Sequence, residues 1–338
     1  MALYWRITLA ACSLLLSFAP AALPFQSLSS DPPVIEPRKR PEPRLGVAPA
    51  MPQAALPPAS LRAETSMVLV PAQVTDAAGA PVSNLSKQDF RIFEDGVEQT
   101  ITDFAIEDAP VSVGFLFDAS ASMRNKMRQS SEAAAAFFST ANRDDEFFLV
   151  EFNERAKLSM PFTTDADAVY KRVSHVRPLG RTSLLDAVHL ALVQMKRARH
   201  ARKAIVIVSD GGDNRSRYTA TQIENAMRES EVQIYSIGIF DPVERRNRVP
   251  EEKNGPQLLD QLAQDSGGRY FSVDNLDDLP AIGERIGEEL RSQYLLGYSP
   301  ANPVRDGGYR RIRVSLAPSA QSPELEIRYR RGYYSPTQ

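Results

Sequence analysis

The chain has 338 residues, which at about 150 residues per domain is enough for two domains with a real core. Its hydrophobic content of 43% and charged content of 24% are ordinary for a globular protein. The formal net charge is -2 and no basic block occurs, so nucleic acid is not indicated as a partner. Because Cys12 is the single cysteine, the chain can form neither an internal disulfide nor a cysteine metal site.

Residues 1–22 are typical of a signal peptide. Arg6 gives a positive start, Thr8–Phe18 is apolar, and Ala19-Pro20-Ala21 offers a small-residue cleavage site. The apolar run is short for a membrane span, which needs about 20 residues. We therefore expect export to the periplasm, the cell surface or the medium, and no transmembrane span in the remaining chain. The alternatives are an uncleaved anchor and lipidation at Cys12, since Leu9-Ala10-Ala11-Cys12 resembles a lipoprotein box.

Residues 23–63 are dense in proline and alanine, which predicts an extended or disordered linker. Residues 64–109 then alternate like β-strands, and so do residues 293–336 near the other end of the chain. Each of these segments alone would lack partners for its edge strands. We therefore expect the two halves to form one small β-sandwich. The expected strands are 66–74, 90–93, 99–106, 294–298, 310–316 and 324–334.

Residues 110–292 have a different pattern, because apolar strands alternate with helical segments. Val111–Phe117 is a nearly continuous apolar run, as expected of a strand buried on both faces of a parallel sheet. The alternation predicts an α/β fold with a doubly wound, mostly parallel, Rossmann-like sheet, inserted into the β-sandwich. Asp144-Asp145-Glu146 is expected to be a solvated loop before a strand. The expected strands are 111–117, 147–152, 157–162, 204–208, 233–240 and 269–273, and the expected helices are 124–141, 165–176, 183–197, 221–230, 258–264 and 276–292.

Polar side chains follow two of these strands, where sheets of this kind bind ligands. Asp118, Ser120 and Ser122 come directly after the first strand, and Asp210 follows the strand at 204–208. Thr182 precedes a helix and should reach the same edge. Carboxylate and hydroxyl oxygens are hard donors that suit Mg²⁺, Mn²⁺ or Ca²⁺. The alternative is that these residues have only a structural role, in which they cap helices and shape turns.

Together, the five residues resemble the metal-ion-dependent adhesion site (MIDAS) of von Willebrand factor type A (VWFA) domains. The resemblance implies that Ser120 and Ser122 bind the metal directly, and that Thr182, Asp118 and Asp210 bind it directly or through water. A coordination position then stays open for a carboxylate of a partner. The flanking segments 85–96 and 330–334 are similar to those of exported bacterial VWFA proteins, which are abundant in acidobacteria.

Other residues are weaker candidates for a site. Asp213 could support the metal ligands without contacting the metal itself, or it could only shape its loop. His175, His189 and His200 lack metal-ligand spacing, and no Gly-x-Ser-x-Gly elbow or phosphate-binding glycine loop occurs.

We therefore expect an exported, adhesion-like binding protein that uses Mg²⁺, or Mn²⁺ or Ca²⁺, to capture an Asp or Glu of a protein partner. An envelope assembly or maturation scaffold is an alternative. A metal-assisted hydrolase is a weaker one, because it would need a general base beside the metal.

Overall fold

The computed structural model describes residues 67–107, 109–240, 254–318, 320 and 325–337. The expected signal peptide and linker, residues 1–22 and 23–63, lie outside the described residues. No helix in the described part of the chain is long and apolar enough to cross a membrane.

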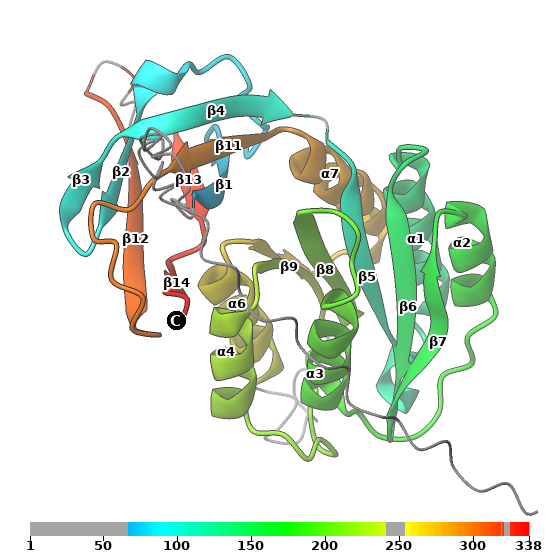
Figure 1. The fold of residues 1–338 in the computed structure, drawn as a ribbon. Coiled ribbons are helices and arrows are strands. Elements are labelled where there is room, and N and C mark those ends of the chain that lie inside the picture. Colours follow the sequence, from blue (N-terminus) through cyan, green and yellow to red (C-terminus); the bar gives the residue numbers. More distant parts are fainter. Residues whose placement is uncertain (1–66, 108, 241–253, 319, 321–324, 338) are drawn as a thin grey trace, which may run out of the picture. The chain divides into compact units, whose positions relative to one another are not determined.

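The α/β part is built on a six-stranded sheet with strand order β10-β9-β8-β5-β6-β7 (Figure 1). All neighbouring strands are parallel except the β6–β7 pair, which is the expected hairpin. The strands are β5 (Val111–Asp118), β6 (Glu146–Phe152), β7 (Ala156–Thr163), β8 (Arg202–Ser209), β9 (Val232–Ile239) and β10 (Arg269–Val273). The predicted doubly wound, mostly parallel sheet is confirmed.

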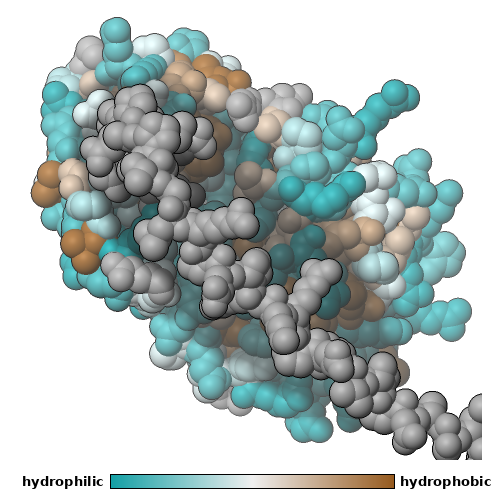
Figure 2. Space-filling model, viewed as in Figure 1, coloured by the Kyte–Doolittle hydropathy of each residue, from teal (hydrophilic) through white to brown (hydrophobic). Residues whose placement is uncertain are grey.

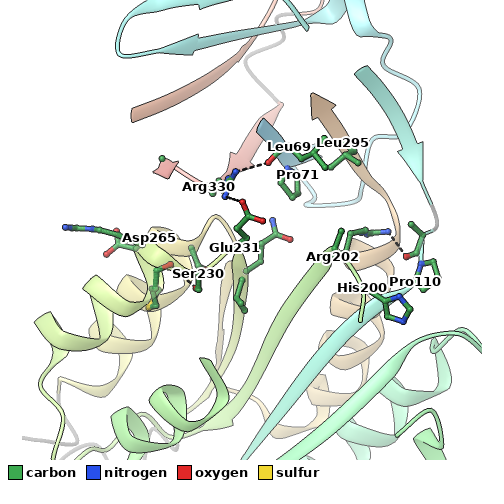
Figure 3. Close-up of a pocket in the computed structure, with 18 of the residues that line it drawn as sticks. Leu69, Pro71, Pro110, His200, Arg202, Ser230, Glu231, Asp265, Leu295 and Arg330 are labelled. Atoms are coloured by element: carbon green, nitrogen blue, oxygen red, sulfur yellow. Dashed lines mark hydrogen bonds and ion pairs between the residues drawn. The ribbon is translucent and has the colours of Figure 1, made fainter. Parts of the chain in front are cut away.

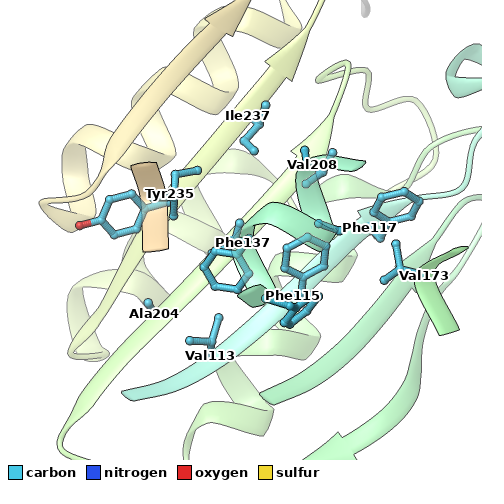
Figure 4. Close-up of a cluster of buried hydrophobic side chains, with 14 of the residues drawn as sticks. Val113, Phe115, Phe117, Phe137, Val173, Ala204, Val208, Tyr235 and Ile237 are labelled. Carbon is cyan, nitrogen blue, oxygen red and sulfur yellow. The ribbon is translucent and has the colours of Figure 1, made fainter. Parts of the chain in front are cut away.

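Helices cover both faces of this sheet, because alternate residues of each buried strand point to opposite sides. Val113, Phe115 and Phe117 of β5 pack with α1, α2 and α7, as Figure 4 shows for Phe137 of α1 and Val173 of α2. Leu116 of β5 points the other way and packs with α3, α4 and α6. The helices are α1 (Met127–Ser139), α2 (Ala166–Ser174), α3 (Leu184–Met195), α4 (Ala220–Glu229), α6 (Gly255–Ser266) and α7 (Leu279–Arg291).

The first helix, α1, begins later than the pattern at 124–141 predicts. Residues Ala121–Met123 form a 3-10 turn, η2, and Lys126 is the N-cap of α1. At the other end of the domain, Gly267 closes α6 as expected, with a left-handed φ of 79°. The last predicted helix divides into the 3-10 turn η4 (Leu276–Asp278) and α7.

The β segments from both ends of the chain form two four-stranded sheets, with orders β13-β1-β11-β4 and β14-β12-β2-β3. Each sheet mixes N-terminal and C-terminal strands, and one buried cluster joins residues of both sheets. The prediction that the two halves complete one β-sandwich is therefore confirmed. The strands are β1 (Val68–Thr75), β2 (Phe90–Glu94), β3 (Val97–Gln99), β4 (Ile101–Glu107), β11 (Gln293–Tyr298), β12 (Tyr309–Leu316), β13 (Glu326–Tyr329) and β14 (Gly332–Tyr334), and a short 3-10 turn, η1 (Lys87–Asp89), precedes β2.

Two expected strands are each divided in the structure. The segment 99–106 is shared between β3 and β4, and the segment 324–334 becomes β13 and β14. In both cases the two pieces belong to different sheets of the sandwich. At these points the chain passes from one sheet of the sandwich to the other. The alternation of apolar and polar side chains is almost unbroken there, so the pattern predicts one strand where the structure has two.

The expectation of a solvated loop at Asp144–Glu146 is wrong for its last two residues, which are buried. Asp145 Oδ1 accepts a hydrogen bond from the amide of Val111 (3.0 Å), and Asp145 Oδ2 pairs with Arg291 at 2.9 Å. Glu146 accepts hydrogen bonds from Ser112 Oγ (2.6 Å) and from Arg199. Burial opposes ionisation of Glu146, but these hydrogen bonds outweigh it and lower the pKa of the carboxyl. Both acids therefore tie the start of β6 to neighbouring elements.

The face of the molecule seen in Figure 2 consists mostly of hydrophilic residues, interrupted by a few apolar spots. The large hydrophobic residues that the described chain exposes are Met67, Val97, Ile106, Leu179, Val193, Val304 and Tyr334. Most of them come from separate elements. Leu179 is the most exposed of them, at 69%.

Candidate metal centre

The five predicted ligands come from three loops at the carboxyl edge of the sheet. Asp118 ends β5, and Asp210 directly follows β8, the neighbouring parallel strand in which Val208 pairs with Phe117. Ser120 and Ser122 lie in the loop that contains η2, and Thr182 lies just before α3. All five side chains are buried except that of Ser122, which is half-buried. The structure therefore places the predicted ligands at one edge of the sheet.

Backbone hydrogen bonds join the three loops to one another. The amide of Ala121 donates to Gly180 O at 2.9 Å, and the amide of Asn214 donates to Thr182 O at 3.1 Å. The side-chain oxygen of Asn214 in turn accepts from the amide of Thr182 at 3.1 Å. These contacts hold the threonine between the serine loop and the loop that follows Asp210.

Asp118 is fixed by hydrogen bonds to both of its carboxylate oxygens. Oδ1 accepts from the amide of Ser120 at 2.8 Å, and Oδ2 accepts from Ser209 Oγ at 2.5 Å. Complete burial and the nearby charge of Asp210 raise the pKa of Asp118 to about 7, although the hydrogen bonds from Ser209 and Ser120 act in the opposite direction. Two buried carboxylates close together favour a bound cation.

The spacing of the two serines fits an octahedral ion. Ser120 Oγ and Ser122 Oγ lie 3.0 Å apart. Adjacent oxygens around Mg²⁺, each about 2.1 Å from the ion, are also about 3 Å apart. The described residues contain no cluster of three His, Cys, Asp or Glu side chains that could hold a metal, so the hydroxyls are essential to this donor set. The residues present therefore fit Mg²⁺ and similar hard cations.

Lys126 is a member of the site that the sequence pattern did not reveal. Its side chain is 2% exposed, and its Nζ lies 3.4 Å from Asp210 Oδ2. A lysine at the start of a helix is unfavourably placed with respect to the helix dipole. That position is a weak indication that the side chain has another partner, but it does not identify Asp210 as that partner. The ammonium supplies a positive charge beside one of the predicted ligands.

Ser209 is the second residue that sequence reasoning missed. Its hydroxyl donates to Asp118 and accepts from the amide of Gly211 at 2.9 Å. It therefore links the end of β5 to the loop that carries Asp210. Its position directly before Asp210 in the sequence is a weak indication that it belongs to the site.

Asp213 stabilises the conformation of its loop through hydrogen bonds. Its carboxylate accepts hydrogen bonds from the amides of Leu185 (3.4 Å) and Ser216 (3.2 Å), which connects the loop after β8 to the first turn of α3. Burial raises the pKa of Asp213, and these hydrogen bonds act against the rise. The geometry favours the loop-shaping alternative over direct support of a metal.

A cavity of about 300 Å³ lies at the other edge of the sheet, where β8 and β9 begin (Figure 3). Arg330 pairs there with Glu231 at 2.9 Å and donates to Leu69 O, and Arg202 donates to Ala109 O (Figure 3). None of the predicted metal ligands lines this cavity. Its polar contacts join strand β1 of the sandwich to the α/β part, which indicates a structural role.

The family model of the von Willebrand factor type A domain matches residues 112–285, more than half of the chain. The chain belongs to the von Willebrand factor type A domain family. This confirms the resemblance drawn from the five ligands. The VWFA match and the donor geometry together support a general metal-dependent protein-interaction module.

Individual relatives of this VWFA protein are distant. A protein of Borreliella burgdorferi described as uncharacterized is 28% identical over 168 residues, which is 46% of this chain and 49% of that protein. This chain therefore spans about half the length of that relative. The solved structure of proximal thread matrix protein 1 from the mussel byssus, with zinc in its MIDAS motif, is 18% identical with a TM-score of 0.47, over 57% of this chain and 48% of that one. A VWFA structure from Catenulispora acidiphila is 13% identical with a TM-score of 0.46, over 77% and 71% of the two chains.

Proposed function

We propose that this protein is an exported binding module that captures an acidic residue of a protein partner through a divalent cation. Asp118, Ser120, Ser122, Thr182 and Asp210 would hold the ion, with Mg²⁺ as the first choice and Mn²⁺ or Ca²⁺ as alternatives. The observation that carries the proposal is the 3.0 Å spacing of the two serine hydroxyls beside two buried carboxylates. Export rests on the signal-like residues 1–22.

The chemistry of capture follows from the donor set. Neutral hydroxyls take up coordination positions without cancelling the charge of the ion, so the ion stays attractive to a further anion. Mg²⁺ keeps several waters when it binds to proteins, and a carboxylate of the partner can replace one of them. The chain's own residues orient and desolvate the ion, and the partner completes its coordination.

We also propose that the protein is not an enzyme. A hydrolase would need a general base beside the metal. Both oxygens of Asp118 accept hydrogen bonds from Ser120 and Ser209, and Asp210 pairs with Lys126. These contacts leave neither carboxylate in a good position to accept a proton from water.

The first test is calorimetric titration of the purified protein with Mg²⁺, Mn²⁺ and Ca²⁺. We expect one ion per chain, and we expect Asp118→Ala to lose that binding. Asp167→Ala, which removes an exposed carboxylate on α2, is the matched control and should bind like the unmodified protein. If Asp118→Ala folds normally and binds the ion unchanged, these residues are not the ligands and the proposal is wrong.

A further inference from the structure

We infer that the partner segment is acidic over several residues, and that exposed arginines around the metal centre select it. The arginine rim, as we name it, consists of Arg124, Arg181, Arg215 and Arg217. The inference rests on the proposed function, because it describes which partner the metal centre takes. It goes beyond the single carboxylate that the ion itself can bind.

Each of the three ligand-bearing loops contributes to the arginine rim. Arg124 comes two residues after Ser122, and Arg181 directly precedes Thr182. Arg215 and Arg217 lie in the loop that runs from Asp210 to the start of α4. The hydrogen bonds from Ala121 to Gly180 and from Asn214 to Thr182 hold these loops together. The arginines therefore belong to the same joined loops as the ligands, at the carboxyl edge of the sheet.

The rim arginines are available to a partner. All four are exposed, and 85% of the side chain of Arg217 is accessible. Arg217 is anchored by a bond from its Nε to Asp186 at 3.1 Å. Among the residues that the structure describes, Arg124, Arg181 and Arg215 have no ion-pair partner. Within the described part of the chain, three guanidinium groups are thus left to meet further carboxylates, as an acidic partner would supply.

Among the residues that the structure describes, the acidic side chains near the rim do not balance this charge. Glu154 lies close to the serine and threonine loops, since a Cβ at Gly180 would be 2.8 Å from its Cγ. Asp213 is half-buried and is engaged by two backbone amides. A divalent ion between Asp118 and Asp210 would offset their negative charge. The described residues of the loaded edge would then present mainly positive charge, which attracts acidic segments and repels basic ones.

Leu179 adds one apolar contact to the same surface. Its side chain is 69% exposed, and its amide donates to Ala119 O at 2.8 Å, next to Ser120. The segment that fits this surface therefore has a central chelating Asp or Glu, further acidic residues on either side, and an apolar residue beside them. Such a partner would associate faster at low ionic strength, because screening weakens contacts between exposed charges.

The test compares two synthetic peptides of equal length. One has a single Asp among Gly and Ser, and the other has the same Asp flanked by Glu residues and one Leu. Both are titrated into the full protein with Mg²⁺ and with EDTA, at low and at high salt. We expect the acidic peptide to bind about tenfold more tightly with Mg²⁺ at low salt, which is the scale of three weak exposed ion pairs. We expect neither peptide to bind in EDTA.

Two triple variants separate the rim from general charge. Arg124→Gln, Arg181→Gln and Arg215→Gln together should abolish the preference between the peptides while Mg²⁺ and the single-Asp peptide still bind. Lys196→Gln, Arg197→Gln and Arg228→Gln remove the same charge from exposed positions at the ends of α3 and α4, and should keep the preference.

The outcomes distinguish this inference from the proposed function. Equal, Mg²⁺-dependent binding of the two peptides would overturn the arginine rim and leave metal-dependent capture intact. A preference that persists in EDTA, or that the control triple variant also loses, would show general ionic attraction and overturn it as well. If neither peptide binds in the presence of Mg²⁺, metal-dependent capture fails and the inference fails with it.

Discussion

Replacing Lys126 by methionine would remove a buried positive charge while keeping much of the side-chain volume. The ammonium lies 3.4 Å from Asp210 Oδ2. At an effective dielectric constant of about 20, two unit charges at that distance attract by about 5 kcal/mol. Measured losses for breaking a buried ion pair are about 3–5 kcal/mol, because the remaining charge stays buried without its partner. We therefore expect the metal-free Lys126→Met protein to lose about 3–5 kcal/mol of its free energy of unfolding.

The loss should depend on the metal. A divalent ion between Asp118 and Asp210 supplies the positive charge that the variant lacks, so Mg²⁺ should restore most of the stability. By linkage, the variant should also bind Mg²⁺ more tightly than the unmodified protein. Thermal unfolding in EDTA and in Mg²⁺ measures this directly, and a loss of this size corresponds to a melting temperature about 10 °C lower in EDTA.

Lys171→Met is the matched control, because Lys171 is exposed on α2. It should melt like the unmodified protein under both conditions. The reasoning is refuted if Lys126→Met is as stable as the unmodified protein in EDTA. It is equally refuted if the variant loses the same stability with Mg²⁺ as without it.

Three further predictions concern pH and two single residues. Because burial and Asp210 raise the pKa of Asp118 to about 7, the metal-free folded protein holds a proton that the unfolded chain has already lost, so its stability should decrease as the pH rises from about 4 to 7. Metal must displace that proton, so calorimetry should show Mg²⁺ affinity falling about tenfold per pH unit below about 7; a constant affinity from pH 8 to 6 would contradict this. Gly211→Ala should weaken Mg²⁺ binding at least about tenfold, because φ at this position is +78° and the new Cβ would lie 2.6 Å from the backbone of Gly255. Gly96→Ala is the control, since a Cβ there would meet nothing within 4 Å. It should cost only about 1 kcal/mol of stability and leave the Mg²⁺ affinity unchanged. Asp145→Asn should lower the free energy of unfolding in urea by about 3–5 kcal/mol, because it removes the buried negative charge that lies 2.9 Å from Arg291, and unchanged stability would show that this pair contributes nothing.

The parts of the fold that the sequence predicts well are those in which one local pattern decides the structure. Val111–Phe117 is apolar at almost every position, which is typical of a strand covered on both faces. The positions of the candidate ligands follow from the same reasoning, because side chains that come directly after parallel strands must share one edge of the sheet. This argument places Asp118 and Asp210 together without any knowledge of distances.

The parts of the fold that the sequence does not predict depend on contacts between residues that are distant in the chain. Asp145 and Glu146 have the composition of an exposed loop, and their burial depends on Arg291 and Arg199, which lie far away in the chain. Lys126 is similar, since nothing nearby in the sequence shows that its ammonium reaches Asp210. Charged residues become buried only where a partner satisfies them, and the partner is chosen by the tertiary structure.

The α/β part is inserted between β4 and β11, which are antiparallel neighbours, with Ile106 opposite Tyr294. The first described strand, β1, also pairs within the sandwich with β13, near the other end of the chain, and Ala72 lies opposite Tyr329. A pulling force on the two ends of the described chain would therefore enter the sandwich at β1 and at β14, the last described strand, which pairs with β12. The inserted α/β part lies outside the path of this force and carries little of the tension. Tension on the two ends would therefore open the sandwich before it reaches the loops of the candidate metal centre.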